Sequence, residues 1–130
     1  MKFMLIAYAT KDSEASKPPD PRLMAAMGQL TEDLTRTGVL VSTGGLAPSS
    51  MGARTRLAGG KLTITDGPFT EAKEIIGGYA IVQVKSKEEA IEIAKRFWQI
   101  HADILGPSYV GEGEIRPLFD PADFAPPSAK

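Results

Sequence analysis

The chain has 130 residues, a formal net charge of -1, one histidine and no cysteine. This length suits one domain, and a chain without net positive charge lacks the electrostatic basis for nucleic-acid binding. Disulfides and cysteine zinc sites are excluded, and a single histidine predicts no transition-metal site, although carboxylates could still hold Mg²⁺. The sequence shows neither a phosphate-binding glycine loop nor a metal cluster, so we expect no metal and no cofactor.

The sequence also lacks the pattern of a membrane protein. No apolar run approaches the roughly 20 residues that a membrane helix needs. The N-terminus shows no charged and apolar leader. We therefore expect a soluble cytoplasmic protein that does not contact membranes.

The first half of the chain predicts two strands joined through a helix. Residues 2–8 form an apolar run of strand length, and residues 10–19 are polar and contain prolines, which indicates a loop. Residues 39–43 are rich in β-branched side chains and predict a short strand. We expect Gly44 and Gly45 to end that strand.

The helix between these strands has clear signals at both ends. Asp20 is a good N-cap, and Pro21 is favoured at the first helical position. Gly38 stands where a left-handed C-terminal cap belongs. Apolar residues repeat at helical spacing between these ends and predict one buried face. They are Leu23, Met27, Leu30 and Leu34.

The second half predicts a hairpin, a strand, a helix and a last strand. Residues 53–57 and 61–65 alternate around a Gly-Gly turn, which is typical of a β-hairpin. Residues 75–84 form a second long apolar run. A capping box at Ser86 starts a helix that should end near Asp103. Residues 114–119 alternate as a strand does, and a Pro/Ala-rich tail follows.

Without the inserted hairpin, this order is βαββαβ, the ferredoxin-like α+β pattern. Both helices must then cover the same face of the sheet. The strands are too apolar for the opposite face to lie bare in water. A second copy laid face to face would cover it, so we predict a homodimer.

One stretch between the hairpin and the next strand is unusually dense in polar side chains. It reads Asp66-Gly67-Pro68-Phe69-Thr70-Glu71-Ala72-Lys73-Glu74. A rigid turn with one aromatic residue can hold such a stretch as a binding loop. The alternative is a solvated connection that happens to be charged.

This stretch resembles the signature of the DGPF proteins, a branch of the YCII-related family. Further segments resemble the family's strands, namely residues 1–6, 37–41, 77–79 and 112–119. The resemblance implies a domain over residues 1–120 with a ferredoxin-like fold that pairs into a dimeric α/β barrel, followed by a tail over residues 121–130. It does not imply a settled reaction.

His101 is the only histidine, so it is the side chain best suited to proton transfer near neutral pH. Asp66 is its most economical partner if the hairpin folds over the edge of the sheet. Each residue also has a structural interpretation: His101 can bond to helix carbonyls at the edge of the core, and Asp66 can lock its own turn.

Other polar residues could bind a substrate. Lys73 could hold an anionic group if the loop closes over the barrel mouth, with its neighbours Glu71 and Glu74. Arg116 offers a bidentate fork and shares a strand face with Glu114. A salt bridge at the dimer seam is the alternative for this pair. Tyr79 could add a hydroxyl, with core packing as the alternative.

The same resemblance implies that this chain lacks the catalytic pair of the short family members. Short YCII-related proteins share a histidine and an aspartate, and their histidine lies in the first helix. Counting back from the glycine that closes this helix places that position at about Met27, which cannot exchange a proton. The polar stretch from Asp66 to Glu74 then looks like the compensating feature.

Two functions therefore compete. In the first, the protein binds a small polar or aromatic metabolite near the DGPF stretch, or acts on it as a cofactor-independent isomerase or lyase. In the second, it is a regulatory module without catalytic activity, because DGPF proteins resemble partners of extracytoplasmic-function sigma factors.

Overall fold

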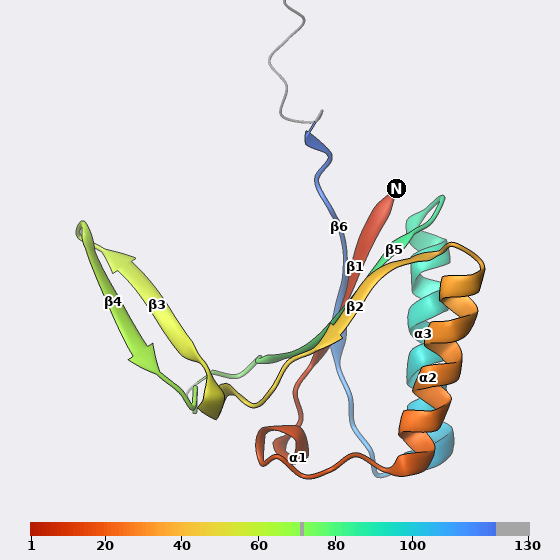
Figure 1. Cartoon of the computed structure of the whole chain (residues 1–130), viewed down its shortest axis with the longest axis horizontal. Helices are drawn as coiled ribbons and strands as arrows, with labels where there is room; N and C mark the ends of the chain where they lie inside the picture. The colour runs from red at the N-terminus through yellow and green to blue at the C-terminus, as the bar shows by residue number, and fades with distance from the viewer. Residues whose placement is uncertain (71, 122–130) are drawn as a thin grey trace, which may run out of the picture.

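The computed structural model describes residues 1–70 and 72–121. Four antiparallel strands form a sheet in the order β2-β5-β1-β6. They are β1 (Lys2–Tyr8), β2 (Leu40–Gly45), β5 (Ile76–Gln83) and β6 (Gly113–Pro117). The two long helices, α2 (Pro21–Arg36) and α3 (Lys87–Leu105), lie on one face of this sheet (Figure 1). This α+β arrangement is compatible with the predicted ferredoxin-like fold.

Local caps start and end the helices largely as the sequence predicts. The Asp20 carboxylate accepts the backbone N–H of Arg22 at 2.8 Å, and Gly38 follows α2 with φ of +77°. Ser86 accepts the N–H of Glu89 at 3.3 Å at the start of α3. That helix runs past the predicted end at Asp103 to Leu105, because its stop signal is Gly106, with φ of +84°.

Two local predictions are wrong. The segment predicted as a loop contains a short helix, α1 (Lys11–Glu14), because Thr10 and Ser13 form a reciprocal capping box. Strand β2 does not end before Gly44 and Gly45, since these residues pair with Tyr79 and Gly78 of β5. The partner strand supplies hydrogen bonds that local propensity does not foresee.

The predicted hairpin forms a separate two-stranded sheet from β3 (Ala53–Ala58) and β4 (Lys61–Asp66). We call it the arm, because it extends from the opposite side of the molecule from the helices (Figure 1). The turn residues Gly59 and Gly60 have φ of +57° and +75°, as a two-residue hairpin turn requires. A short 3-10 helix, η1 (Ser49–Met51), precedes the arm.

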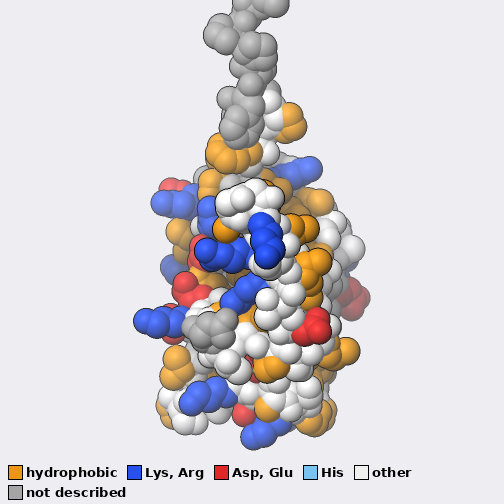
Figure 2. Space-filling view, turned by 90° about the vertical axis from the view of Figure 1, so that its left-hand side faces the viewer, with side chains coloured by type: hydrophobic (Ala, Val, Ile, Leu, Met, Phe, Trp, Pro, Cys, Tyr) orange, Lys and Arg blue, Asp and Glu red, His pale blue; other side chains and the backbone are white. Residues whose placement is uncertain are grey.

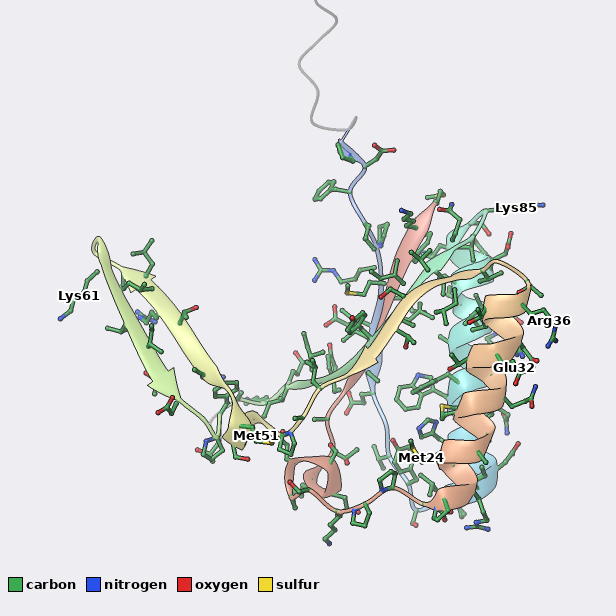
Figure 3. All side chains as sticks on the ribbon, in the orientation of Figure 1. Met24, Glu32, Arg36, Met51, Lys61 and Lys85 are labelled. Atoms are coloured by element: carbon green, nitrogen blue, oxygen red, sulfur yellow. The ribbon has the colours of Figure 1, made fainter. Side chains whose placement is uncertain are left out.

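The arm has one apolar face and one polar face. Its register pairs Thr55 with Ile64 and Leu57 with Leu62, and directly paired residues share a face. The opposite face carries Arg54, Arg56, Lys61, Thr63 and Thr65. Basic side chains gather on the side of the molecule where the arm lies (Figure 2). Lys61 points away from the four-stranded sheet, so the apolar face turns back toward it (Figure 3).

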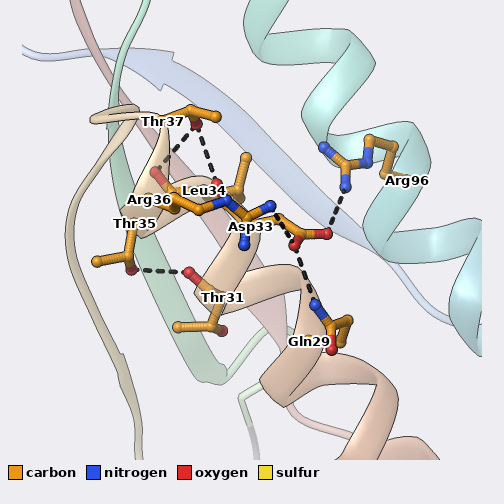
Figure 4. A network of polar contacts seen from close by, with 8 residues as sticks. All are labelled: Gln29, Thr31, Asp33, Leu34, Thr35, Arg36, Thr37 and Arg96. Carbon is orange, nitrogen blue, oxygen red and sulfur yellow. Dashed lines mark hydrogen bonds and ion pairs between the residues drawn. The ribbon is translucent and has the colours of Figure 1, made fainter.

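The two long helices are joined by Asp33 of α2 (Figure 4). Its carboxylate accepts from Gln29 at 3.0 Å and Arg36 at 3.0 Å, and pairs with Arg96 of α3 at 3.6 Å. The hydrogen bond from Gln29 and the two guanidinium groups lower the pKa of Asp33. This network holds α2 against α3 on the side away from the sheet.

None of the helices within residues 1–70 and 72–121 has the length and apolar content needed to cross a membrane. The predicted tail falls almost wholly outside the described residues, which stop at residue 121.

Candidate functional site

A row of small residues crosses the four-stranded sheet on the face that the helices cover. Gly45 of β2 pairs with Gly78 of β5, Gly78 with Ala7 of β1, and Ala7 with Gly113 of β6. None of these residues has a side chain longer than a methyl group. The sheet therefore presents almost bare backbone along this small-residue row.

The rows beside it carry progressively larger side chains. The next row is Thr43, Ala80, Leu5 and Ile115, and the one after it is Leu40, Val82, Phe3 and Pro117. Phe3 and Val82 are fully buried and lie in the hydrophobic core. The space between sheet and helices is thus filled at one end and left open at the other.

A cleft of about 940 Å³ occupies this open end. Its floor includes the small-residue row, and its opposite wall comes from α2 and α3. The wall residues are mostly apolar or aromatic, among them Met24, Met27, Leu30, Ile93, Phe97 and Trp98. A mostly apolar cavity of several hundred Å³ with few polar groups is the usual form of a small-molecule site.

An aromatic cluster stiffens the α3 wall. Trp98 lies edge-on to Phe97 with ring centroids 4.8 Å apart, and His101 lies 4.5 Å from Phe97 and 5.5 Å from Tyr109. Gly111 fits against the indole so closely that a Cβ there would come within 2.3 Å of it. Burial in this cluster raises the pKa of the Tyr109 phenol. The Trp98 ring is therefore held in place beside the cleft.

His101 packs against the other aromatic rings of this cluster. It is only 8 % exposed, and its Nδ1 donates to the carbonyl oxygen of Phe97 at 2.8 Å. A carbonyl can only accept, so Nδ1 carries the hydrogen of this bond. This is the helix-carbonyl arrangement that the sequence left open as a structural alternative for His101.

The DGPF stretch anchors the base of the arm. A Cβ on Gly67 would lie 1.8 Å from the carbonyl oxygen of Ser49, so only glycine fits there. The N–H of Phe69 donates to the Ser49 hydroxyl at 3.1 Å, and the N–H of Ser49 donates to the Glu14 carboxylate at 2.8 Å. The Arg54 guanidinium lies 4.4 Å from the Phe69 ring centroid. We call these contacts the arm lock.

The structure does not bring the two predicted catalytic residues together. Asp66 is the exposed last residue of β4, where it pairs with Ala53. His101 lies in α3, on the opposite side of the four-stranded sheet (Figure 1). No hydrogen bond joins the two within the described part of the chain, so their acid–base pairing gains no support from a single copy.

Two of the predicted substrate-binding residues, Glu74 and Glu114, meet at the phenol of Tyr8 on the uncovered face of the sheet. The hydroxyl donates to Glu114, which also pairs with Arg116 at 3.9 Å. The bond to Glu114, then desolvation and the bond to Glu74, raise the pKa of Tyr8. A phenol has one hydrogen to share between two carboxylates, so this cluster concentrates negative charge.

Of the remaining predicted residues, Tyr79 borders the cleft and Lys73 does not. Tyr79 has its ring against Gly44, where a Cβ would come within 3.0 Å. Lys73 is exposed in the loop before β5. Glu71 lies outside the described residues.

Comparison with known proteins now gives the family. Residues 1–105 match the sequence profile of the YCII-related domain. The chain belongs to the YCII-related family. A similar protein, "Uncharacterized protein R00369" of Rhizobium meliloti (strain 1021), is 30% identical over 120 residues, which are 91% of this chain and 92% of that protein.

The YCII-related match ends at the last residue of α3, before β6 begins. Strand β6 still completes the small-residue row with Gly113 and supplies Glu114 to the polar cluster. The predicted membership of the family is confirmed, while the DGPF branch stays a prediction.

The small-residue row of this YCII-related chain does not follow from the sequence pattern alone. Its signal is present in Gly44-Gly45, Gly77-Gly78 and Gly113, but glycines inside strands are ordinarily taken as breakers or bulges. Gly77 does lie at a bulge, where the β1–β5 register shifts between Ala7 and Tyr8. Only the pairing register distinguishes it from Gly78, which belongs to the row.

Proposed function

We propose that this YCII-related protein binds a small, neutral, aromatic molecule in the cleft between the sheet and helices α2 and α3. The observation that carries the proposal is the small-residue row, which creates space at one end of an otherwise packed core. Filling this space with larger side chains would have stabilised the chain, since each buried methylene contributes about 0.8 kcal/mol.

The two walls of the cleft favour a flat ring. Bare strand backbone along Gly45, Gly78 and Ala7 offers a smooth surface, and Phe97 and Trp98 offer aromatic contacts opposite. Aromatic pairs add about 0.5–1.5 kcal/mol beyond the area they bury. The nearby side chains of Met24 and Met27 can adapt to the outline of such a ligand.

The charges at the rim favour a neutral ligand. Lys95 contributes to the lining, but its ammonium pairs with Glu92 at 2.9 Å. Glu114 stands near the rim and is engaged by Tyr8 and Arg116. Among the described residues, the lining contains no histidine and no aspartate. The proposal is therefore one of binding, and it assigns no acid–base step to His101 or Asp66.

The single tryptophan makes the proposal testable. Trp98 is the only tryptophan in the chain and lines the cleft. The neutral probe N-phenyl-1-naphthylamine absorbs where tryptophan emits, so a bound probe should quench Trp98 and emit in its place. Saturable energy transfer in the folded protein, lost when urea unfolds it, supports the site. Absence of transfer at saturating probe overturns the proposal.

A thermal-shift screen of aromatic metabolites would then search for the natural ligand. A compound present at 100 times its Kd should stabilise the protein by about 2.7 kcal/mol. A true cleft ligand should also displace the probe.

We also propose that a second copy covers the other face of the sheet and completes a dimeric α/β barrel. Met4, Ile6 and Ile81 alternate with the helix-facing residues and so point to this uncovered face. A sheet with helices on one face needs some cover for apolar side chains on the other. The oligomeric state in solution, measured as described below, tests this part.

A further inference from the structure

The apolar face of the arm has no partner within the described chain. All residues of β3 and β4 are exposed, and the side chains of Leu57, Leu62 and Ile64 are 73%, 60% and 66% exposed. A two-stranded hairpin alone is marginally stable in water. Three large apolar residues on one face of such a hairpin indicate a surface that another molecule covers.

The arm lock holds this hairpin at a fixed angle. Gly67 packs against the Ser49 carbonyl, and Phe69 donates to the buried Ser49 hydroxyl. Ser49 is bound in turn by Glu14 of α1, so the lock ties the arm to the body of the protein. A surface loop that needed only to connect two strands would not require these contacts.

We propose that the apolar face of the arm docks on a second copy of this chain, and that the DGPF stretch serves to aim it. This inference rests on the proposed dimer. We call the contact between the apolar face of each arm and the partner copy the clamp. In a twofold arrangement the arm of each copy lies over the other copy, so the same residues form the contact on both copies.

The area of the interface favours a second copy over an unrelated partner. From strand spacings, the uncovered sheet offers a flat footprint of about 330 Å² and one face of the arm about 200 Å². A stable interface buries about 600–1,000 Å² on each side, so the sheet alone is too small. With its own arm and the surface under the partner's arm, each copy would bury about 700 Å².

This chain also offers an apolar counter-surface for the partner's arm. Leu46 and Met51 are exposed just after the end of β2 and in η1, before the arm begins. A single twofold partner would therefore cover the sheet, the arm and this apolar rim together. The polar face of the arm, with Arg56 and Lys61, would remain in solvent.

Three consecutive lysine substitutions on β4 test the clamp. Leu62→Lys and Ile64→Lys place a charge on the apolar face, whereas Thr63→Lys places the same charge on the polar face. All three positions are exposed, so the fold of one copy should tolerate each change. Sedimentation velocity over a concentration series would give the dimer Kd of each variant.

We expect a dimeric wild type, Kd values raised about 30-fold or more by Leu62→Lys and Ile64→Lys, and a Kd unchanged by Thr63→Lys. A monomeric wild type would overturn both the dimer and the clamp. A dimeric wild type with all three variants equally dimeric would overturn the clamp alone. If all three variants weakened the dimer equally, the clamp would also be refuted, because the effect would then not depend on which face of the arm carries the charge. Far-UV circular dichroism and cooperative urea unfolding check that each variant is folded, independently of whether the cleft binds the probe.

Discussion

Replacement of Gly45 by valine should make the protein more stable and at the same time close its cleft. Gly45 lies in the small-residue row on β2, and a Cβ there would meet no atom within 4 Å. Its backbone does not lie in the left-handed region. The valine side chain can therefore enter the cleft without strain.

The gain in stability follows from two contributions. Removing a glycine from a strand contributes about 0.5–1 kcal/mol. Half-burying the valine side chain contributes about another 0.7 kcal/mol, which is half the value for full burial. For a chain of this size, an increase of about 1–2 kcal/mol in the free energy of unfolding corresponds to a rise in Tm of about 3–8 °C. The same substitution, Gly45→Val, should lower the affinity for N-phenyl-1-naphthylamine at least tenfold, because the new methyl groups would occupy the space proposed for the aromatic rings of the probe.

The adjacent glycine provides a matched control. Gly44 points to the other face of the sheet, where a Cβ would lie 3.0 Å from the Tyr79 ring. Gly44→Val should therefore lower stability, by about 1–3 kcal/mol. Although Gly44 and Tyr79 border the cleft, the new side chain points to the other face, so probe affinity should fall less than in Gly45→Val. Thermal unfolding and Trp98 energy transfer measure both quantities. If Gly45→Val binds the probe as the wild type does, or lowers Tm, then the small-residue row does not form the space in which the probe binds.

Three further results are expected. Gly67→Ala should cost about 3 kcal/mol in urea unfolding, because the new methyl group would meet the Ser49 carbonyl oxygen at 1.8 Å; a wild-type urea midpoint would contradict the arm lock. The hydrogen bond from Gln29, with nearby guanidinium groups, lowers the pKa of Asp33, so its stabilising effect is present above the ordinary value of 3.8 and is lost as pH falls through the lowered pKa. Asp33→Asn should then flatten the acid side of the curve of stability against pH. Hydrogen-bonded carboxylates raise the pKa of Tyr8, so its contribution is complete below its ordinary value of 10.0 and is lost as pH rises through the raised pKa; Tyr8→Phe should lose less stability in alkali than the wild type.

The elements of this fold could be predicted because their signals are local. An N-cap such as Asp20 and a left-handed cap such as Gly38 act within one turn of their helix. The arm could be predicted for the same reason, since Gly59 and Gly60 define its turn. These residues need no knowledge of distant parts of the chain.

The candidate site could not be predicted because it depends on register. Gly45, Gly78, Ala7 and Gly113 come from four strands and meet only when the sheet is assembled. A shift of one residue would turn any of them to the other face.

The DGPF stretch illustrates a different limit. Its charges suggested a site for chemistry, whereas the contacts that hold the arm are made by Gly67 and Phe69 with Ser49. Ser49 precedes this stretch by a whole hairpin, so the sequence around Asp66 does not reveal the contact. Charge density in a short segment is visible in sequence, but the backbone oxygen that excludes a side chain is not.

The pairing of the first strand with the last also governs how the protein reaches its folded state. Phe3 of β1 faces Pro117 of β6, so nearly the whole chain must be synthesised before this ladder can form. Contacts between such distant residues carry a high entropic cost before they contribute energy, and they slow folding. A nascent chain that has emerged only as far as α3 can build three strands and both helices but not the fourth strand. Until β6 arrives, the edge of β1 is unpaired and can associate with other chains.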